Sequence, residues 1–116
     1  MRKLATVVAV LLALLTVSSS GYAASFDCDR ARTADEVAIC DHRELNDLDV
    51  RMATLFEVAT GLVAMGERGA IRDEQREWLA QRGTCGDDIR CLSRSYRRRI
   101  VALEAVLDEI KSRGPY

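Results

Sequence analysis

Four cysteines, Cys28, Cys40, Cys85 and Cys91, are the residues of this 116-residue chain best suited to covalent chemistry. Three pairings are possible, and the spacing favours Cys28–Cys40 and Cys85–Cys91 because each pair closes a short local loop. A zinc site is the alternative, but the closely spaced cysteine pairs of structural zinc modules are absent. We therefore expect two disulfides, each stabilising the fold by about 2–4 kcal/mol, and no metal or other cofactor.

Three charged residues, Asp49, Arg82 and Arg99, lie on or at the edge of helix faces that the apolar pattern assigns to the interior. At 100° per residue, for example, Asp49 points close to Phe56. An isolated buried charge is very costly, so we expect these side chains to form a structural ion pair in which Asp49 is buried against an arginine. Acid–base catalysis needs a convergent partner group in a cleft, and the sequence shows none, so we expect no enzymatic activity.

The remaining polar residues form no motif for catalysis or for nucleic-acid binding. His42 is the only histidine, and one ligand does not make a metal site. The chain has 17 lysines and arginines against 18 acidic residues, and without Arg2 and Lys3 its net charge is near −3. This weak acidity argues against nucleic acid as the main partner and is compatible with a basic protein.

The N-terminus has the order of a secretory signal peptide: a basic start, an apolar stretch over 4–17 and small residues up to Ala24. The apolar stretch, about 14 residues, is shorter than the roughly 20 that cross a bilayer as a stable anchor. We expect a signal peptide over 1–23, cleaved after Ala23, and one helical domain over 24–116. The product would be periplasmic or secreted and not embedded in a membrane.

The domain reads as helix throughout, since its only proline is Pro115 and no stretch alternates long enough for a strand. A capping box predicts a short helix over 33–40, and three longer helices follow over about 42–62, 70–82 and 89–113. Gly66 and Gly69 are expected to bracket a turn between the first two of them. The fold class is therefore all-α: a small, disulfide-stabilised antiparallel bundle of three main helices plus a short N-terminal one. The apolar positions expected to face the core are Leu45, Leu48, Met52, Leu55, Phe56, Ala59, Leu62, Ile71, Trp78, Leu79, Ile89, Leu92, Tyr96, Ile100, Leu103, Leu107 and Ile110.

Several segments together resemble the LprI-type lysozyme-inhibitor family. In the first half they are Phe-Asp-Cys at 26–28, Glu-Val-Ala-Ile-Cys at 36–40 and Glu-Leu-Asn-Asp-Leu-Asp at 44–49. In the second half they are Gln-Arg-Glu-Trp-Leu-Ala-Gln-Arg at 75–82, Cys-Gly at 85–86 and the Cys-Leu, Tyr and Arg-Ile positions of 91–100. The similarity covers nearly all of the chain after the predicted signal peptide. The family is named for a lipoprotein that inhibits lysozyme; this chain has no cysteine at the expected cleavage point, and we expect it to have no second domain.

The resemblance implies an exported binding protein that inhibits lysozyme by occluding its cleft, and the expected partner is lysozyme or another cell-wall hydrolase. We expect the contact to come from a loop clipped by the second disulfide, with Thr84, Gly86, Asp87, Asp88 and Arg90 as the contact residues. The alternative is a structural or adaptor module of the cell envelope, which binds an envelope protein or a wall component without inhibiting an enzyme.

Overall fold

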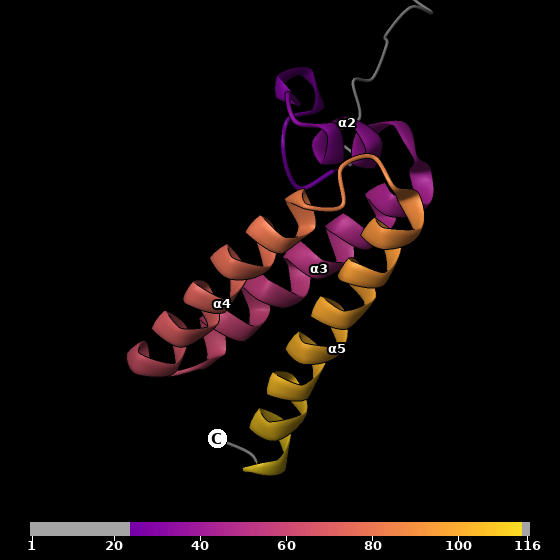
Figure 1. Cartoon of the computed structure of the whole chain (residues 1–116). Coiled ribbons are helices and arrows are strands. Elements are labelled where there is room, and N and C mark those ends of the chain that lie inside the picture. The colour runs from indigo at the N-terminus through magenta and orange to yellow at the C-terminus, as the bar shows by residue number, and fades with distance from the viewer. Residues whose placement is uncertain (1–23, 115–116) are drawn as a thin grey trace, which may run out of the picture.

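The computed structural model describes residues 24–114, so the predicted signal peptide over 1–23 lies outside the described residues. A 3-10 turn, η1 (Cys28–Arg30), comes first and is followed by α2 (Ala34–Asp41), α3 (Arg43–Leu62), α4 (Met65–Gly83) and α5 (Ile89–Ser112) (Figure 1). No strand occurs within the described range. The predicted all-α class, with three long helices and a short N-terminal one, is confirmed.

The three long helices run up and down, and α2 lies across one end of them (Figure 1). α3 and α5 run in the same direction and make the most extensive contact of the bundle. α4 runs in the opposite direction and connects the end of α3 to the start of α5. We call the end that holds η1, α2 and the α4–α5 loop the clipped end. The opposite end, with the α3–α4 turn and the last turns of α5, is the open end.

The start of α3 differs by one residue from the prediction. The capping box of Thr33 and Glu36 begins α2 as expected. However, α2 includes Asp41 and α3 begins at Arg43, because only His42 leaves the helical conformation between the two. The ring Nδ1 of His42 lies 2.8 Å from the carbonyl oxygen of Ala38, so this side chain supplies a partner to the end of α2.

The predicted turn between Gly66 and Gly69 is wrong, because both glycines lie inside α4 and the chain turns around Val63 instead. A glycine in a helix costs only about 1 kcal/mol relative to alanine, which tertiary contacts can offset. Here Val63 is buried, and the guanidinium of Arg68 donates to the carbonyl oxygens of Thr60 and Val63 at 2.7 and 3.2 Å. Arg68 thereby provides partners for the otherwise unpaired carbonyls at the end of α3.

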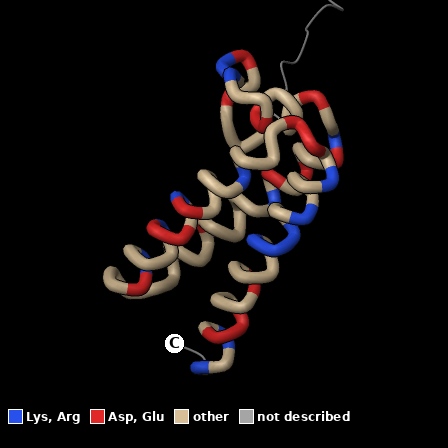
Figure 2. The backbone as a smooth tube through the Cα atoms, viewed as in Figure 1, with Lys and Arg blue, Asp and Glu red and all other residues tan. Residues whose placement is uncertain are grey.

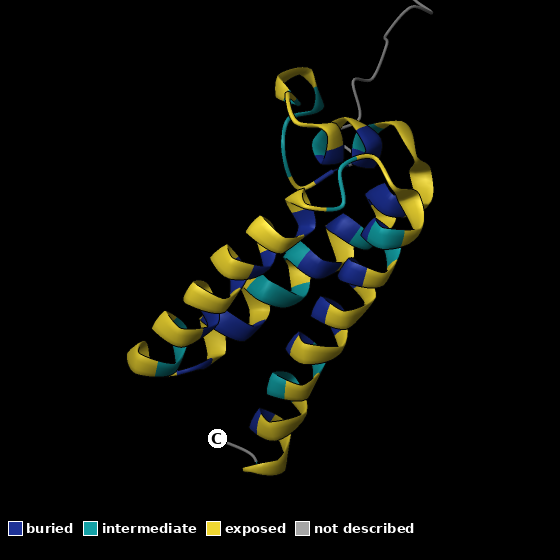
Figure 3. Ribbon diagram, viewed as in Figure 1, coloured by how far each residue is buried: buried dark blue, intermediate teal, exposed yellow. Residues whose placement is uncertain are grey.

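The core follows the inward faces of the long helices (Figure 3). Most of the predicted core positions are buried or half-buried, and Leu45, Leu92 and Tyr96 have no exposed surface. The prediction is wrong for Leu62 and Ile89, which are exposed because they are terminal residues of their helices. It is also wrong for Leu79, which is exposed on α4 and lines an open cavity.

Candidate functional site

Both disulfides that the spacing favours are present at the clipped end. Cys28 of η1 is bonded to Cys40 near the end of α2, with their Cα atoms 5.8 Å apart. Cys85 of the α4–α5 loop is bonded to Cys91 in the first turn of α5, with a Cα separation of 5.5 Å. Neither bridge joins two distant parts of the chain, so each one stiffens a local segment rather than the whole bundle.

The loop between α4 and α5 is held by its own hydrogen bonds as well as by its disulfide. The hydroxyl of Thr84 donates to the carbonyl of Gln81 at 2.6 Å, and the carboxylate of Asp88 accepts from the backbone N–H of Cys91 at 3.0 Å. Gly86 has a φ of +57°, a conformation that glycine adopts without a steric penalty. These three predicted contact residues therefore shape the loop.

The other two predicted contact residues are available to a partner. Asp87 and Arg90 are both exposed, and neither side chain forms a hydrogen bond or an ion pair with another residue of 24–114. They flank Asp88, whose side chain caps α5. The start of α5 therefore carries one exposed carboxylate, that of Asp87, and one exposed guanidinium, that of Arg90.

A groove at the clipped end joins this loop to α2, and its volume is about 640 Å³. We call it the α2–α5 groove; it is lined by Arg32, Thr33, Ala34, Val37, Ala38, Asp41, His42, Asp87 and Ile89. Val37 and Ile89 are exposed apolar side chains in it. The α2 side of this surface was not predicted, because nothing in the order of the residues indicates that α2 lies against the α4–α5 loop.

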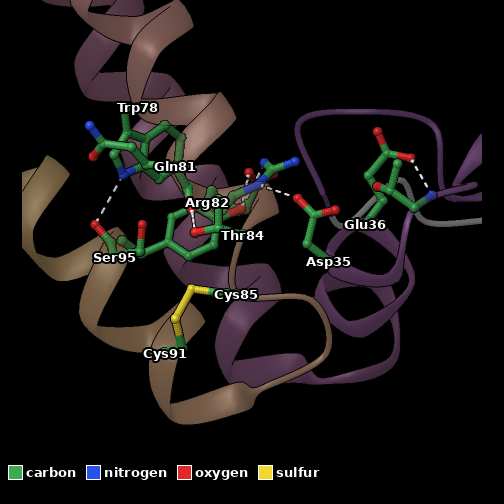
Figure 4. Close-up of polar contacts among 12 residues, drawn as sticks. Asp35, Glu36, Trp78, Gln81, Arg82, Thr84, Cys85, Cys91 and Ser95 are labelled. Carbon is green, nitrogen blue, oxygen red and sulfur yellow. Dashed lines mark hydrogen bonds and ion pairs between the residues drawn. A yellow bond between two sulfur atoms is a disulfide. The ribbon is translucent and has the colours of Figure 1, made fainter.

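A network of hydrogen bonds at the clipped end joins the buried side chains of Asp35, Asp49, Arg82 and Tyr96 to the backbone N–H of Ser25, an exposed residue; we call these five residues the polar cluster. The carboxylate of Asp49 accepts from the hydroxyl of Tyr96 at 2.8 Å and from the backbone N–H of Ser25 at 2.6 Å. The Tyr96 hydroxyl accepts from Nη1 of Arg82 at 3.3 Å. Nε of Arg82 donates to Asp35 at 2.9 Å (Figure 4).

The structure corrects the predicted partners of these charges. Asp49 is buried as predicted, with 1% of its surface exposed, but the Tyr96 hydroxyl stands between it and the guanidinium of Arg82. The ion pair of Arg82 is with Asp35, a residue of the first turn of α2. Asp35 was missed because the first turn of a capped helix ordinarily holds solvated acidic residues.

Arg99 is buried but belongs to a separate set of contacts. Its Nε donates to the side-chain oxygen of Gln75 at 2.8 Å, and its Nη2 donates to the carbonyl of Ile71 at 3.3 Å. Its ion pair is with Glu74, at 3.4 Å. All three partners lie on α4 nearer the open end, so the prediction that Arg99 pairs with Asp49 is wrong.

The electrostatics of the polar cluster favour a neutral tyrosine beside charged neighbours. Burial would raise the pKa of Asp35, but hydrogen bonds from Thr33 and Arg82, together with the Arg82 charge, outweigh it and lower the pKa below its usual value. Burial and the negative charge of Asp49 raise the pKa of Tyr96 far above its ordinary value. Tyr96 therefore stays protonated and donates to Asp49 at any physiological pH.

Aromatic rings surround the guanidinium of Arg82. Its central carbon lies 5.8 Å from the ring centre of Trp78 and 6.0 Å from that of Phe26. Trp78 meets Tyr96 edge to face at 5.2 Å and donates from its indole nitrogen to the carbonyl of Ser95 at 3.2 Å (Figure 4). These contacts shield the cluster from water and stabilise the cation, so the arrangement is structural and contains no exposed nucleophile.

The described residues form no metal-binding group and no helix that could span a membrane. Within residues 24–114, no group of three histidine, cysteine or acidic side chains comes together in a way that would hold a metal ion. None of the helices in this range combines the length and the apolar composition that a membrane span requires.

The fold and its two bridges define a small, all-helical domain of the disulfide-stabilised kind. Its sequence is similar to Lipoprotein LprI of Mycobacterium tuberculosis and of Mycobacterium bovis, with 29% identity over 94 residues. The match covers 78% of this chain and 46% of the lipoproteins, so the chain spans about half the length of the curated relatives it matches. No family model matches the chain, and no solved structure matches it. The resemblance to LprI predicted from the sequence is confirmed by this similarity.

Proposed function

We propose that this chain is an exported binding protein that inhibits a lysozyme by occluding its cleft. The observation that carries the proposal is the stiff surface of the clipped end, where the α2–α5 groove adjoins Asp87 and Arg90. The class of partner comes from the similarity to Lipoprotein LprI and from the family resemblance in the sequence. The mechanism is occlusion and not chemistry.

Rigidity supports the clipped end as the binding surface. Binding loses less entropy when the contact residues are already ordered, and the loop over 84–88 is held by a disulfide, an N-cap and a hydroxyl contact. Val37 and Ile89 supply apolar area for a contact that excludes water. Lysozyme cleaves its substrate with two carboxyl groups, and the guanidinium of Arg90 is a suitable donor to such groups.

Charge supports a basic partner. Without Arg2 and Lys3 the chain has a net charge near −3. Asp41 and Asp87 both line the groove, and acidic residues are frequent around the clipped end (Figure 2). Lysozymes of the common animal type are basic, so the attraction would raise the association rate in a salt-sensitive manner.

The decisive experiment measures lysozyme turnover on cell-wall substrate in the presence of the purified, oxidised domain. We expect inhibition at micromolar concentration, and we expect reduction of the disulfides to weaken it. Absence of inhibition across several lysozyme types would contradict the proposal.

Two matched substitutions locate the surface. Val37, in the groove, and Val58, on α3, are each 43% exposed, so Val37→Arg and Val58→Arg change equally accessible valines. We expect Val37→Arg to raise the inhibition constant about tenfold or more, since central apolar contacts carry much of the binding energy. Val58→Arg should leave the constant within about twofold. Equal effects of the two would place the contact elsewhere.

An adaptor module of the cell envelope is the second candidate, and the open end favours it. Met65 is 85% exposed there, and Leu62 of the same turn is also exposed. Such a pair is suited to an apolar partner. Under this reading, Met65→Ser would abolish binding to an envelope protein, whereas lysozyme would be unaffected by the domain at any concentration.

A further inference from the structure

A second cavity, of about 410 Å³, lies beside the N-terminal segment and between α2, α3 and α4. Phe26, Phe56 and Leu79 form part of its apolar wall. Asp49 and Arg82 of the polar cluster also line it, although they are only 1% and 7% exposed. Charged groups in such an apolar place need compensating charges close by.

The charges of the polar cluster do not balance. Two carboxylates, those of Asp35 and Asp49, are buried with one guanidinium, that of Arg82. Tyr96 of α5 is neutral, because burial and the charge of Asp49 raise its pKa. Glu36 of α2 also lines the cavity and adds negative charge, and its carboxylate accepts from the backbone N–H groups of Arg32 and Thr33 and from no cationic side chain of the described residues. The groups that face Asp49 from α2, α4 and α5 therefore leave it short of one positive charge.

The N-terminal segment is in position to supply that charge. The backbone nitrogen of Ser25 lies 2.6 Å from Oδ2 of Asp49, and Ala24 is itself buried. Successive backbone nitrogens are no farther apart than successive Cα atoms, about 3.8 Å, so the nitrogen of Ala24 lies at most about 6.4 Å from this carboxylate oxygen. At that range a positive charge and a carboxylate stabilise each other's charged forms.

We propose that the α-ammonium group of Ala24, formed when the leader is removed, is the counter-ion of Asp49. A signal peptidase hydrolyses the Ala23–Ala24 peptide bond with one water molecule, which leaves a carboxylate on the leader and an amine on Ala24. The amine takes up a proton at neutral pH and completes the polar cluster. The uncleaved chain offers only the neutral N–H of Ser25, so the exported form is more stable than its precursor. This inference rests on the proposed export and not on the proposed partner.

The first test is the pKa of the α-amino group in a chain that begins at Ala24. Competitive acylation over a range of pH measures it, with the exposed Lys111 as an internal reference amine. An ordinary α-amino group has a pKa of about 7.7–8.0, and we expect an increase of about one unit or more, which slows acylation at pH 7 about tenfold. A value in the ordinary range would overturn the proposal.

Variants separate the role of Asp49 from general effects of charge. Asp49→Asn should return the pKa of the α-amino group to its ordinary range. Asp47→Asn removes an exposed carboxylate from the same helix and should leave that pKa unchanged. Equal effects of the two substitutions would contradict a specific pair.

A second measurement does not depend on the folding of Asp49→Asn. N-acetylation of Ala24, or one additional N-terminal alanine, should lower the urea midpoint of the otherwise unchanged chain. Because the pair raises the pKa in the folded state, its stabilisation is complete below about pH 8 and is lost as the pH rises through the folded value. The midpoints should therefore converge at high pH, and identical midpoints at pH 7 would overturn the proposal. Lysozyme takes no part in these assays, so failure of the proposed inhibition leaves their outcome unaffected.

Processing is checked separately by mass spectrometry of the exported protein. A chain that begins at Ala24 supports the inference, and one that begins at another residue contradicts it. A chain that retains its leader overturns it.

Discussion

The two ends of the bundle are held together by different means. The clipped end contains both disulfides and the polar cluster, whose contacts connect η1, α2 and the long helices. The open end relies on buried apolar residues such as Val63 and Ile110, and on ion pairs at the surface such as that of Arg113 with Glu67 at 4.0 Å. Short segments bury too little apolar surface to hold their place, so cross-links and buried polar contacts position them.

This difference coincides with the proposed division of function. A surface that must keep its shape for a partner lies where the chain is most constrained, because preorganisation lowers the entropy lost on binding. The open end has no such requirement in the inhibition proposal. Changes at the two ends should therefore differ in their effect on both stability and inhibition.

The largest loss of stability should follow removal of the guanidinium at the centre of the clipped end. Arg82→Ala leaves Asp35 buried without its ion-pair partner, and breaking a buried pair in this way costs about 3–5 kcal/mol. Urea unfolding measures the change. Arg94→Ala, an exposed arginine of α5, is the control and should change the free energy of unfolding by no more than about 0.5 kcal/mol. Equal losses would remove the distinction between the cluster and the surface.

Removal of the disulfides should have the next largest effects, and they should differ in size. The Cys28–Cys40 bridge closes the longer loop, with a sequence separation of 12 against 6 for Cys85–Cys91. From loop entropy, replacing each pair by serine costs about 3 and about 2 kcal/mol, respectively. Loss of Cys85–Cys91 should nevertheless weaken lysozyme inhibition more, because it frees the loop over 84–88. The reverse order of inhibition would favour α2 as the main contact.

Acid should weaken the clipped end through Asp35. Its pKa is lower in the folded chain than in the unfolded one, since hydrogen bonds and the Arg82 charge outweigh the effect of burial. Its contribution to stability is therefore complete above the unfolded value of about 3.9 and is lost as the pH falls below it toward the folded value. Urea midpoints between pH 6 and pH 2 should fall less steeply for Asp35→Asn than for the unchanged chain. Parallel curves would contradict this assignment.

The smallest effect is expected at the open end. Glu67→Gln removes one carboxylate partner of Arg113 at the surface and leaves the other, Glu109 at 2.7 Å, in place; pairs of this kind contribute about 0–1 kcal/mol. The change in the free energy of unfolding should decrease further in 1 M salt, and lysozyme inhibition should stay unchanged. A loss as large as that of a disulfide would show that the open end is as constrained as the clipped one.

The order of helices and the cysteine pairs could be predicted because both depend on residues close together in the chain. The capping box at Thr33 and the short loop between Cys85 and Cys91 are local signals, and both predictions are confirmed. The failures lie where local preference competes with packing. Gly66 signals a turn by composition, but the buried Val63 and the hydrogen bonds of Arg68 extend the helix over it.

By itself, the sequence determined the helices, the disulfides and the burial of Asp49, because helical periodicity and short loop closures are properties of neighbouring residues. Only the tertiary structure decided that Arg82 pairs with Asp35 and that Tyr96 bridges to Asp49. It also decided that α2 and the α4–α5 loop share one groove. The partner of a long side chain depends on how far each helix is rotated and displaced against the others. Those rotations are set by the packing of the entire core and not by any one segment.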